Sequence, residues 1–177
     1  MPMATTDRHN ELTSSLFGEI YDLFKKREIH ALQSDCALVH WGQRDKNELT
    51  SLIDVKDKND IEDIDDFLEI IILELDYVKP DFMLFKDNPY LRNERGTRRA
   101  GQPDLIVEIW SRSNTKRDKE FLRQLYATSA ITEFWQIEQD SNVVKCSMGK
   151  TILPDQSLTN ILKTQRGIEF DLRHLKK

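Results

Sequence analysis

The chain has 177 residues, of which 38% are hydrophobic and 32% are charged, and this is typical of one globular domain with its own core. Its 26 lysines and arginines against 31 acids give a formal net charge of −5, which excludes bulk electrostatic attraction to nucleic acid or membranes, though not a local basic patch. No apolar run approaches membrane-spanning length and the N-terminus lacks an apolar signal core, so we expect a cytoplasmic protein with no membrane partner.

We expect one domain over residues 1–177, in which residues 1–6 form a loose leader. A helix is predicted from Asp7 to about Arg27, because apolar residues recur there at helical spacing. These residues are Leu12, Leu16, Ile20, Leu23 and Phe24. A strand is predicted from Ala37 to Trp41. The two cysteines, Cys36 and Cys146, lack metal-ligand spacing and are expected to be small buried residues.

The middle of the chain alternates between charged and apolar segments. Residues 54–66 are rich in Asp and Lys but lack the pattern of a calcium loop, so a solvated loop is expected. The run from Phe67 to Leu75 suits a strand or a short helix, and its β-branched isoleucines favour a strand. After Pro80, Asp81 should open a strand that ends at Phe85. Residues 86–102 form a predicted basic loop between two strands.

The next apolar segment, from Leu105 to Ile109, predicts a buried strand that contains one acid, Glu108. Side chains alternate along a strand, so Glu108 shares a face with Asp104, Ile106 and Trp110. Burying an unpaired carboxylate is unfavourable, and Glu108 should therefore be paired, hydrogen-bonded or bound to a cation.

A helix over residues 116–129 and a buried strand from Glu133 to Ile137 complete a strand–helix–strand unit, whose two strands should be parallel if they share a sheet. Further along the chain we predict a strand from Val143 to Ser147, a short helix from Leu158 to Leu162 and a closing strand from Ile168 to Leu172.

Strand geometry selects the acid that lies beside Glu108. Asp104 is four residues away on the same strand, about 13 Å at roughly 3.3 Å per residue, which is too far for one magnesium ion to bind both. If the strands after Asp81 and Asp104 are antiparallel neighbours, Asp81 lies next to Glu108. A shared metal ion and a structural salt bridge to a nearby Arg or Lys are equally good explanations of this pair. Asp104 is instead expected to cap a loop or strand entry.

Several motifs together resemble the Uma family of restriction-endonuclease-like proteins, which belongs to the PD-(D/E)xK nuclease superfamily. The resemblance covers most of residues 7–140 and is carried by Arg8-His9, Val78-Lys-Pro-Asp81-Phe-Met-Leu-Phe85, Gln102-Pro-Asp-Leu-Ile-Val-Glu108-Ile-Trp-Ser111, Asp118, Tyr126 and Thr132-Glu-Phe-Trp135. It implies an α/β fold of restriction-endonuclease type, a mixed sheet flanked by helices. It also implies that Asp81 and Glu108 bind a divalent cation, Mg²⁺ or Mn²⁺, with a lysine to assist.

The lysine is where this chain departs from the family. The superfamily position two residues after the Glu holds Trp110, and the family's helix position holds Leu122, which also suits core packing. Lys119, one turn earlier, is our candidate charge stabiliser, although a solvated helix lysine is the ordinary alternative. Arg123 is a second candidate, but a guanidinium hardly ever acts as an acid or base.

Two residues of the first helix are further candidates. The resemblance allows Glu19 as an additional metal ligand, for which an exposed helix glutamate is the simpler explanation. His9 could face the site, and a surface or hydrogen-bonded histidine is again the simpler explanation.

The resemblance implies a Mg²⁺-dependent endonuclease that hydrolyses DNA phosphodiester bonds, and possible homodimerisation. The basic loop 86–99 and the helix segment 116–123 are candidate phosphate contacts, with plain solvation as the alternative. The alternative function is a catalytically degraded nuclease relative that acts as a DNA-binding or protein-interaction module.

Overall fold

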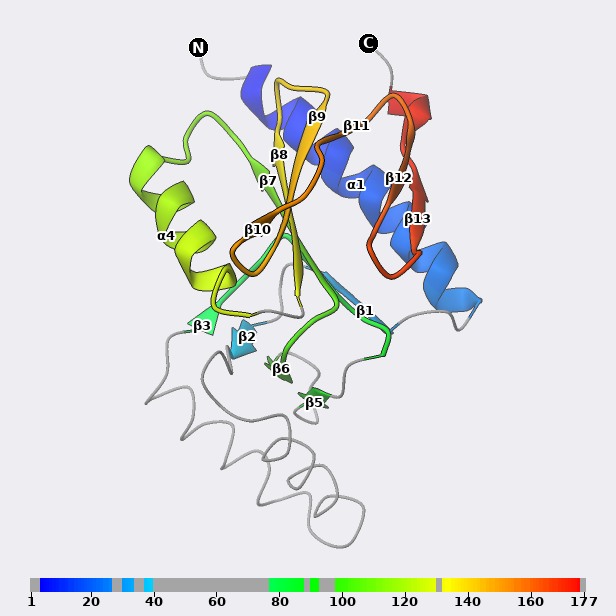
Figure 1. The fold of residues 1–177 in the computed structure, drawn as a ribbon. Coiled ribbons are helices and arrows are strands. Elements are labelled where there is room, and N and C mark those ends of the chain that lie inside the picture. Colours follow the sequence, from blue (N-terminus) through cyan, green and yellow to red (C-terminus); the bar gives the residue numbers. More distant parts are fainter. Residues whose placement is uncertain are drawn as a thin grey trace, which may run out of the picture.

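The computed structural model of the chain describes residues 4–26, 30–33, 37–39, 77–87, 90–92, 98–129 and 132–175. Its elements, in chain order, are α1 (Ala4–Lys25), β1 (His30–Gln33), β2 (Ala37–Val39), β3 (Tyr77–Val78), β4 (Phe82–Phe85), β5 (Tyr90–Arg92), β6 (Arg98–Gly101), β7 (Leu105–Trp110), α4 (Lys116–Tyr126), β8 (Glu133–Glu138), β9 (Val143–Met148), β10 (Thr151–Ile152), β11 (Gln156–Ser157), β12 (Ile161–Lys163), β13 (Glu169–Asp171) and the 3-10 helix η1 (Arg173–Leu175) (Figure 1).

The main sheet has the strand order β1-β4-β7-β8-β9-β10, and β11 pairs with β9. Strand β4 runs antiparallel to β7, and β7 runs parallel to β8, to which α4 connects it. Both arrangements were expected from the sequence, and both are confirmed. The result is a mixed sheet with β7, the strand that carries Glu108, at its centre.

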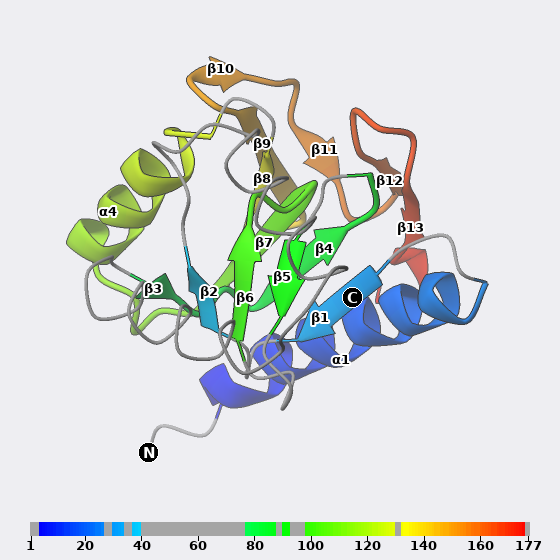
Figure 2. The same cartoon turned by 90° about the horizontal axis from the view of Figure 1, so that it is seen from below.

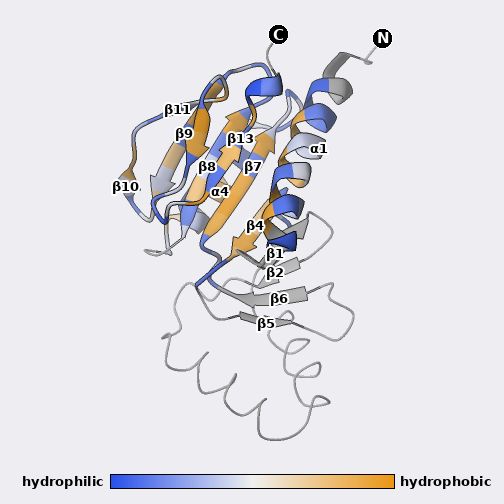
Figure 3. Cartoon of the chain, turned by 90° about the vertical axis from the view of Figure 1, so that its right-hand side faces the viewer, coloured by the Kyte–Doolittle hydropathy of each residue, from blue (hydrophilic) through white to orange (hydrophobic). Residues whose placement is uncertain are grey.

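Helices α1 and α4 cover opposite faces of this sheet, because the alternation along β7 gives each face its own apolar set. Leu105, Val107 and Ile109 pack in one cluster with the inner face of α1. Ile106 and Trp110 pack in a second cluster on the α4 side. Figure 3 shows the apolar strands in orange beside α1, whose polar residues face away from them. Glu108 is therefore on the α4 side of the sheet.

Two smaller sheets complete the described structure. Strands β3, β2, β6 and β5 form a four-stranded sheet in that order, and β12 pairs with β13. The four-stranded sheet lies at the end of the main sheet where β7 begins (Figures 1 and 2). The hairpin of β12 and β13 packs on the α1 side of the main sheet, where Leu162 and Phe170 join the cluster around α1.

Three predictions of secondary structure were wrong. Helix α1 begins at Ala4, so residues 4–6 belong to it and not to a loose leader. The predicted short helix over residues 158–162 is a turn followed by β12, in which Leu162 is buried between two exposed neighbours, the period of a strand. The predicted basic loop contains β5 and β6, which pair with each other in the smaller sheet.

Other predictions fall partly or wholly outside the described residues. These are the loop 54–66, the strand Phe67–Leu75 and the environment of Cys36. Cys146, in contrast, is buried as expected. No helix among the described residues combines the length and the apolar character that crossing a membrane requires.

Candidate functional site

Asp81 lies directly before β4, and its side chain extends to the neighbouring strand β7. Phe82 is in register with Val107, so Asp81 is the next residue along and lies opposite Glu108. The Oδ2 atom of Asp81 accepts a hydrogen bond of 2.7 Å from the backbone N–H of Ile109. This bond orients the Asp81 carboxylate at the end of β7, beside Glu108.

Glu108 is buried, with 7% of its surface exposed, and its Oε1 accepts a hydrogen bond of 2.8 Å from the hydroxyl of Tyr126. Burial is the main cause that raises the pKa of Glu108 to about 8, and the neighbouring charge of Asp81 raises it further. Hydrogen bonds from Tyr126 and from the backbone of Asp81 oppose this rise. The acid is hydrogen-bonded as the sequence required, but these bonds do not compensate its charge.

The pKa of Asp81 is also raised, chiefly by burial, while the backbone N–H of Ile109 and the charge of His9 oppose the rise. Two neighbouring acids with raised pKa values favour either a shared proton or a cation between them. Without a bound proton or a cation, two ionised carboxylates at this site would repel each other.

His9 faces this pair from the second turn of α1. Its Nε2 lies 3.9 Å from Oδ1 of Asp81, and its side chain is 28% exposed. The sequence signal was the Arg8-His9 step of the family resemblance, for which we considered a residue that faces the site and, as the simpler explanation, a surface or hydrogen-bonded histidine. His9 lies inside α1, as the predicted helix also had it, on the side that meets Asp81.

Tyr126 reaches Glu108 from the last residue of α4. A capping box at Thr115 and Asp118 sets the start of this helix, since each residue hydrogen-bonds the backbone of the other. The Tyr126 ring packs against Phe134 of β8, with 4.7 Å between the ring centroids. Burial and the nearby Glu108 raise the pKa of Tyr126, so its hydroxyl remains protonated and donates to Glu108.

Lys119 is not directed to either carboxylate. Its Nζ forms an ion pair of 2.7 Å with Glu138 of β8 and lies 5.0 Å from the centre of the Trp110 ring. Arg123 also lies over Trp110, at 4.8 Å, and its Nε donates to Gln136 at 2.8 Å. Trp110 is buried, and two cations lie over its ring at the position where the superfamily has its lysine. Leu122 packs against the apolar cluster around Tyr126, which confirms its expected core role.

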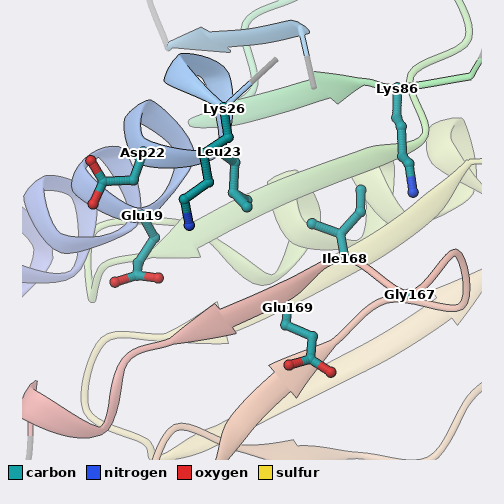
Figure 4. A pocket seen from close by; sticks show the side chains of 8 residues that line it. All are labelled: Glu19, Asp22, Leu23, Lys26, Lys86, Gly167, Ile168 and Glu169. Carbon is teal, nitrogen blue, oxygen red and sulfur yellow. The ribbon is translucent and has the colours of Figure 1, made fainter. Parts of the chain in front are cut away.

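Glu19 lies far from the pair. It follows His9 by ten residues on α1, which is about 15 Å along the helix axis. Its Oε2 accepts a hydrogen bond of 3.2 Å from the backbone N–H of Asp171. Figure 4 shows Glu19 in a different pocket, of about 390 Å³, with Asp22, Leu23, Lys26, Lys86, Gly167, Ile168 and Glu169. The structure does not bring Glu19 to Asp81 and Glu108.

Asp104 has the loop-capping role expected of it. Its Oδ2 accepts hydrogen bonds from the backbone N–H groups of Lys86, at 2.6 Å, and Asp87, at 3.1 Å. Its Oδ1 lies 2.7 Å from a guanidinium nitrogen of Arg166. Asp104 therefore holds the chain where it leaves β4 and has no part in the pair at the other end of the strand.

The oxygen ligands of the pair suit Mg²⁺. Within the described residues, no group of three or more Asp, Glu, His or Cys side chains is placed to hold a metal ion. Magnesium is commonly bound by only one or two carboxylates, with water and substrate phosphates as the other ligands. Asp81 and Glu108 fit this smaller set, and a cation there would favour the ionised form of both acids, whose pKa values burial raises.

Comparison with known proteins agrees with the fold. A protein-family model named Uma2, described as "Putative restriction endonuclease", matches residues 48–147, more than half of the chain. No curated protein matches. A solved structure described as "a putative nuclease belonging to DUF820", from Anabaena variabilis, is similar with a TM-score of 0.57 and 14% identity, over 96% of this chain and 82% of that chain. This likeness confirms the α/β fold of restriction-endonuclease type.

Proposed function

The chain belongs to the Uma2 family, and from this we propose that it is a Mg²⁺-dependent endonuclease that hydrolyses DNA phosphodiester bonds. Asp81 and Glu108 are the proposed metal ligands. The observation that carries the proposal is the placement of these two acids side by side on antiparallel strands, where no cationic side chain among the described residues neutralises Glu108. A divalent cation bound there would stabilise charge on a phosphodiester and lower the pKa of a water molecule.

The surrounding residues prepare these ligands for binding. The Ile109 N–H holds one oxygen of Asp81, and the Tyr126 hydroxyl holds one oxygen of Glu108. The imidazole of His9 is partly exposed, and its Nε2 lies 3.9 Å from Oδ1 of Asp81. Such fixed outer partners reduce the reorganisation that metal binding requires.

Cleavage assays with DNA of several forms test the proposal. We expect wild-type protein with Mg²⁺ or Mn²⁺ to cut plasmid, linear duplex or single-stranded DNA, and Glu108→Ala to lose roughly 10²-fold or more of that rate. Glu169→Ala is the matched control, because it removes an acid that is exposed and paired with Lys163 on the hairpin of β12 and β13. Equal cleavage by wild type and Glu108→Ala would refute the assigned site.

A second measurement concerns Tyr126. In Tyr126→Phe the ring can keep its packing against Phe134, but Glu108 loses its hydroxyl donor. We expect the affinity for Mn²⁺, measured by isothermal titration calorimetry, to fall about 10- to 100-fold, as for other outer partners of metal ligands. An unchanged Mn²⁺ affinity would show that Tyr126 only packs.

One observation favours the alternative function, a degraded nuclease that binds DNA or a protein. The proposed charge stabiliser Lys119 is paired with Glu138, and Trp110 and Leu122 occupy the positions of the missing lysine. If Lys119 serves catalysis, Lys119→Ala lowers the cleavage rate without changing Mn²⁺ affinity. DNA binding by a wild-type protein that cleaves none of the DNA forms would support the alternative.

A further inference from the structure

A groove of about 600 Å³ lies between α4 and the strands β8, β9 and β10. Among the side chains that line it are Arg123 on α4, Gln136 on β8, Lys145 on β9, Lys150 directly before β10 and Ile152 in β10. None of these residues belongs to the carboxylate pair, so the groove is a separate feature of the same face of the sheet.

The groove is connected to the carboxylate pair by a row of neighbours across the sheet. Glu108 is in register with Gln136, and Gln136 is in register with Lys145. Adjacent strands lie about 4.8 Å apart, so the backbone of Lys145 is about 10 Å from that of Glu108. The row passes under α4, where Tyr126 bonds Glu108 and Arg123 bonds Gln136. The face thus changes from acidic to cationic within two strands.

Two cations of the groove are available to a ligand. Lys145 and Lys150 are exposed, and neither forms an ion pair within the part of the chain that the structure describes. Two acids, Glu120 and Asp155, also line the groove. Glu120 forms an ion pair with Arg123 and accepts a hydrogen bond from Gln124. The net charge of the lining is therefore positive, in a chain whose net charge is −5.

A buried amide adds a directional donor to these charges. Gln136 is 8% exposed, and its Oε1 accepts from Arg123. That bond leaves the Nε2 group as a donor, and it gives no hydrogen bond to another described residue. A buried amide donor beside free ammonium groups is suited to a ligand with several acceptor oxygens and a negative charge, which is the chemistry of a phosphate.

We propose that this groove binds backbone phosphates of the nucleic-acid strand whose cleavage is assigned to Asp81 and Glu108. The inference rests on the proposed function and adds the place where the substrate is held. Lysine contacts to phosphates supply affinity and orientation without reading base sequence. The groove therefore predicts a binding mode that depends strongly on salt and weakly on sequence.

The test measures binding separately from cleavage. Fluorescence anisotropy with labelled single-stranded and duplex oligonucleotides, in EDTA, compares wild type with Lys145→Ala/Lys150→Ala. The control Lys25→Ala/Lys26→Ala removes the same charge from the exposed end of α1. We expect the groove variant to bind at least 10-fold more weakly at low salt, and its slope of log affinity against log salt to be smaller by about 1.5–2. The control should change affinity less than two-fold.

Equal affinities of the groove variant and its charge-matched control would overturn the inference, as would the absence of oligonucleotide binding by wild type. Binding measurements with a nucleoside monophosphate and with inorganic phosphate distinguish a site for a nucleic-acid strand from a site for a free phosphate. Saturable binding of these small anions that needs Lys145 and Lys150, with oligonucleotide binding unaffected by their loss, would also overturn it. Unchanged cleavage by Glu108→Ala, together with weakened oligonucleotide binding by the groove variant, would contradict the proposed function alone, so the two failures are distinguishable.

Discussion

In metal-free buffer, Glu108→Gln is expected to be more stable than wild type at pH 9, and the difference is expected to disappear toward pH 4.5. Burial and Asp81 raise the pKa of Glu108 from its ordinary 4.5 to about 8 in the folded protein. The folded state therefore binds a proton that the unfolded state releases between these two pH values. Wild-type stability is highest below pH 4.5 with respect to this group, and falls as the pH rises toward 8.

The size of this effect is on the order of 5 kcal/mol above pH 8, because each tenfold change in proton affinity corresponds to about 1.4 kcal/mol. Glutamine has nearly the same shape as glutamate and carries no charge, so the variant lacks this pH dependence. Urea unfolding of both proteins from pH 4.5 to 9 measures the difference. Glu169→Gln is the control, because that acid is exposed and its substitution should leave the pH profile unchanged.

Divalent metal should reduce this difference in stability. A cation that binds the ionised pair stabilises the folded wild type by about 2.7 kcal/mol when its concentration is 100 times the dissociation constant. Glu108→Gln has lost one of two carboxylates and should gain much less. If Mg²⁺ and Mn²⁺ at millimolar concentration stabilise both proteins equally, the pair is not their binding site.

The placement of this pair was predictable because it depends on backbone geometry alone. An antiparallel connection between the strands after Asp81 and Asp104 leaves only one arrangement, with Asp81 beside Glu108 and Asp104 at the far end. Alternation along β7 likewise determined that Glu108 would lie on the face opposite Leu105 and Val107. Both statements need strand direction and period, and neither needs the conformation of a long side chain.

The contacts of Lys119 and Glu19 could not be predicted in the same way. A lysine has four rotatable bonds, so its helical position left both the pair and Glu138 within reach, and the structure has Glu138. Glu19 is on a helix whose direction across the sheet is set by packing of Leu12, Leu16 and Ile20, and that direction takes it to Asp171. His9 was within the predicted helix, but which side of that helix meets Asp81 depends on how α1 packs across the sheet, and the structure places its Nε2 3.9 Å from Oδ1 of Asp81.

The same pairing of strands places Asp104 at the other end of β7 from the proposed metal site. Asp104→Ala is therefore expected to lose about 3 kcal/mol of folding stability without losing metal affinity. The carboxylate is almost fully buried and holds Arg166 together with the N–H groups of Lys86 and Asp87. Removing one member of such a group typically costs 3–5 kcal/mol, and the partial exposure of Arg166 places this case at the lower end, at about 3 kcal/mol.

Asp104→Asn should lie between wild type and Asp104→Ala, because an amide oxygen still accepts from the two backbone N–H groups while the charge opposite Arg166 is lost. Urea unfolding gives the stabilities, and calorimetric titration with Mn²⁺ gives the affinity, which should remain within about two-fold of wild type because Asp104 is roughly 13 Å from Glu108 along β7. A variant of Asp104 that unfolds normally but no longer binds Mn²⁺ would assign Asp104 to the metal site. That result would contradict the pairing of Glu108 with Asp81, which follows from the β4–β7 register.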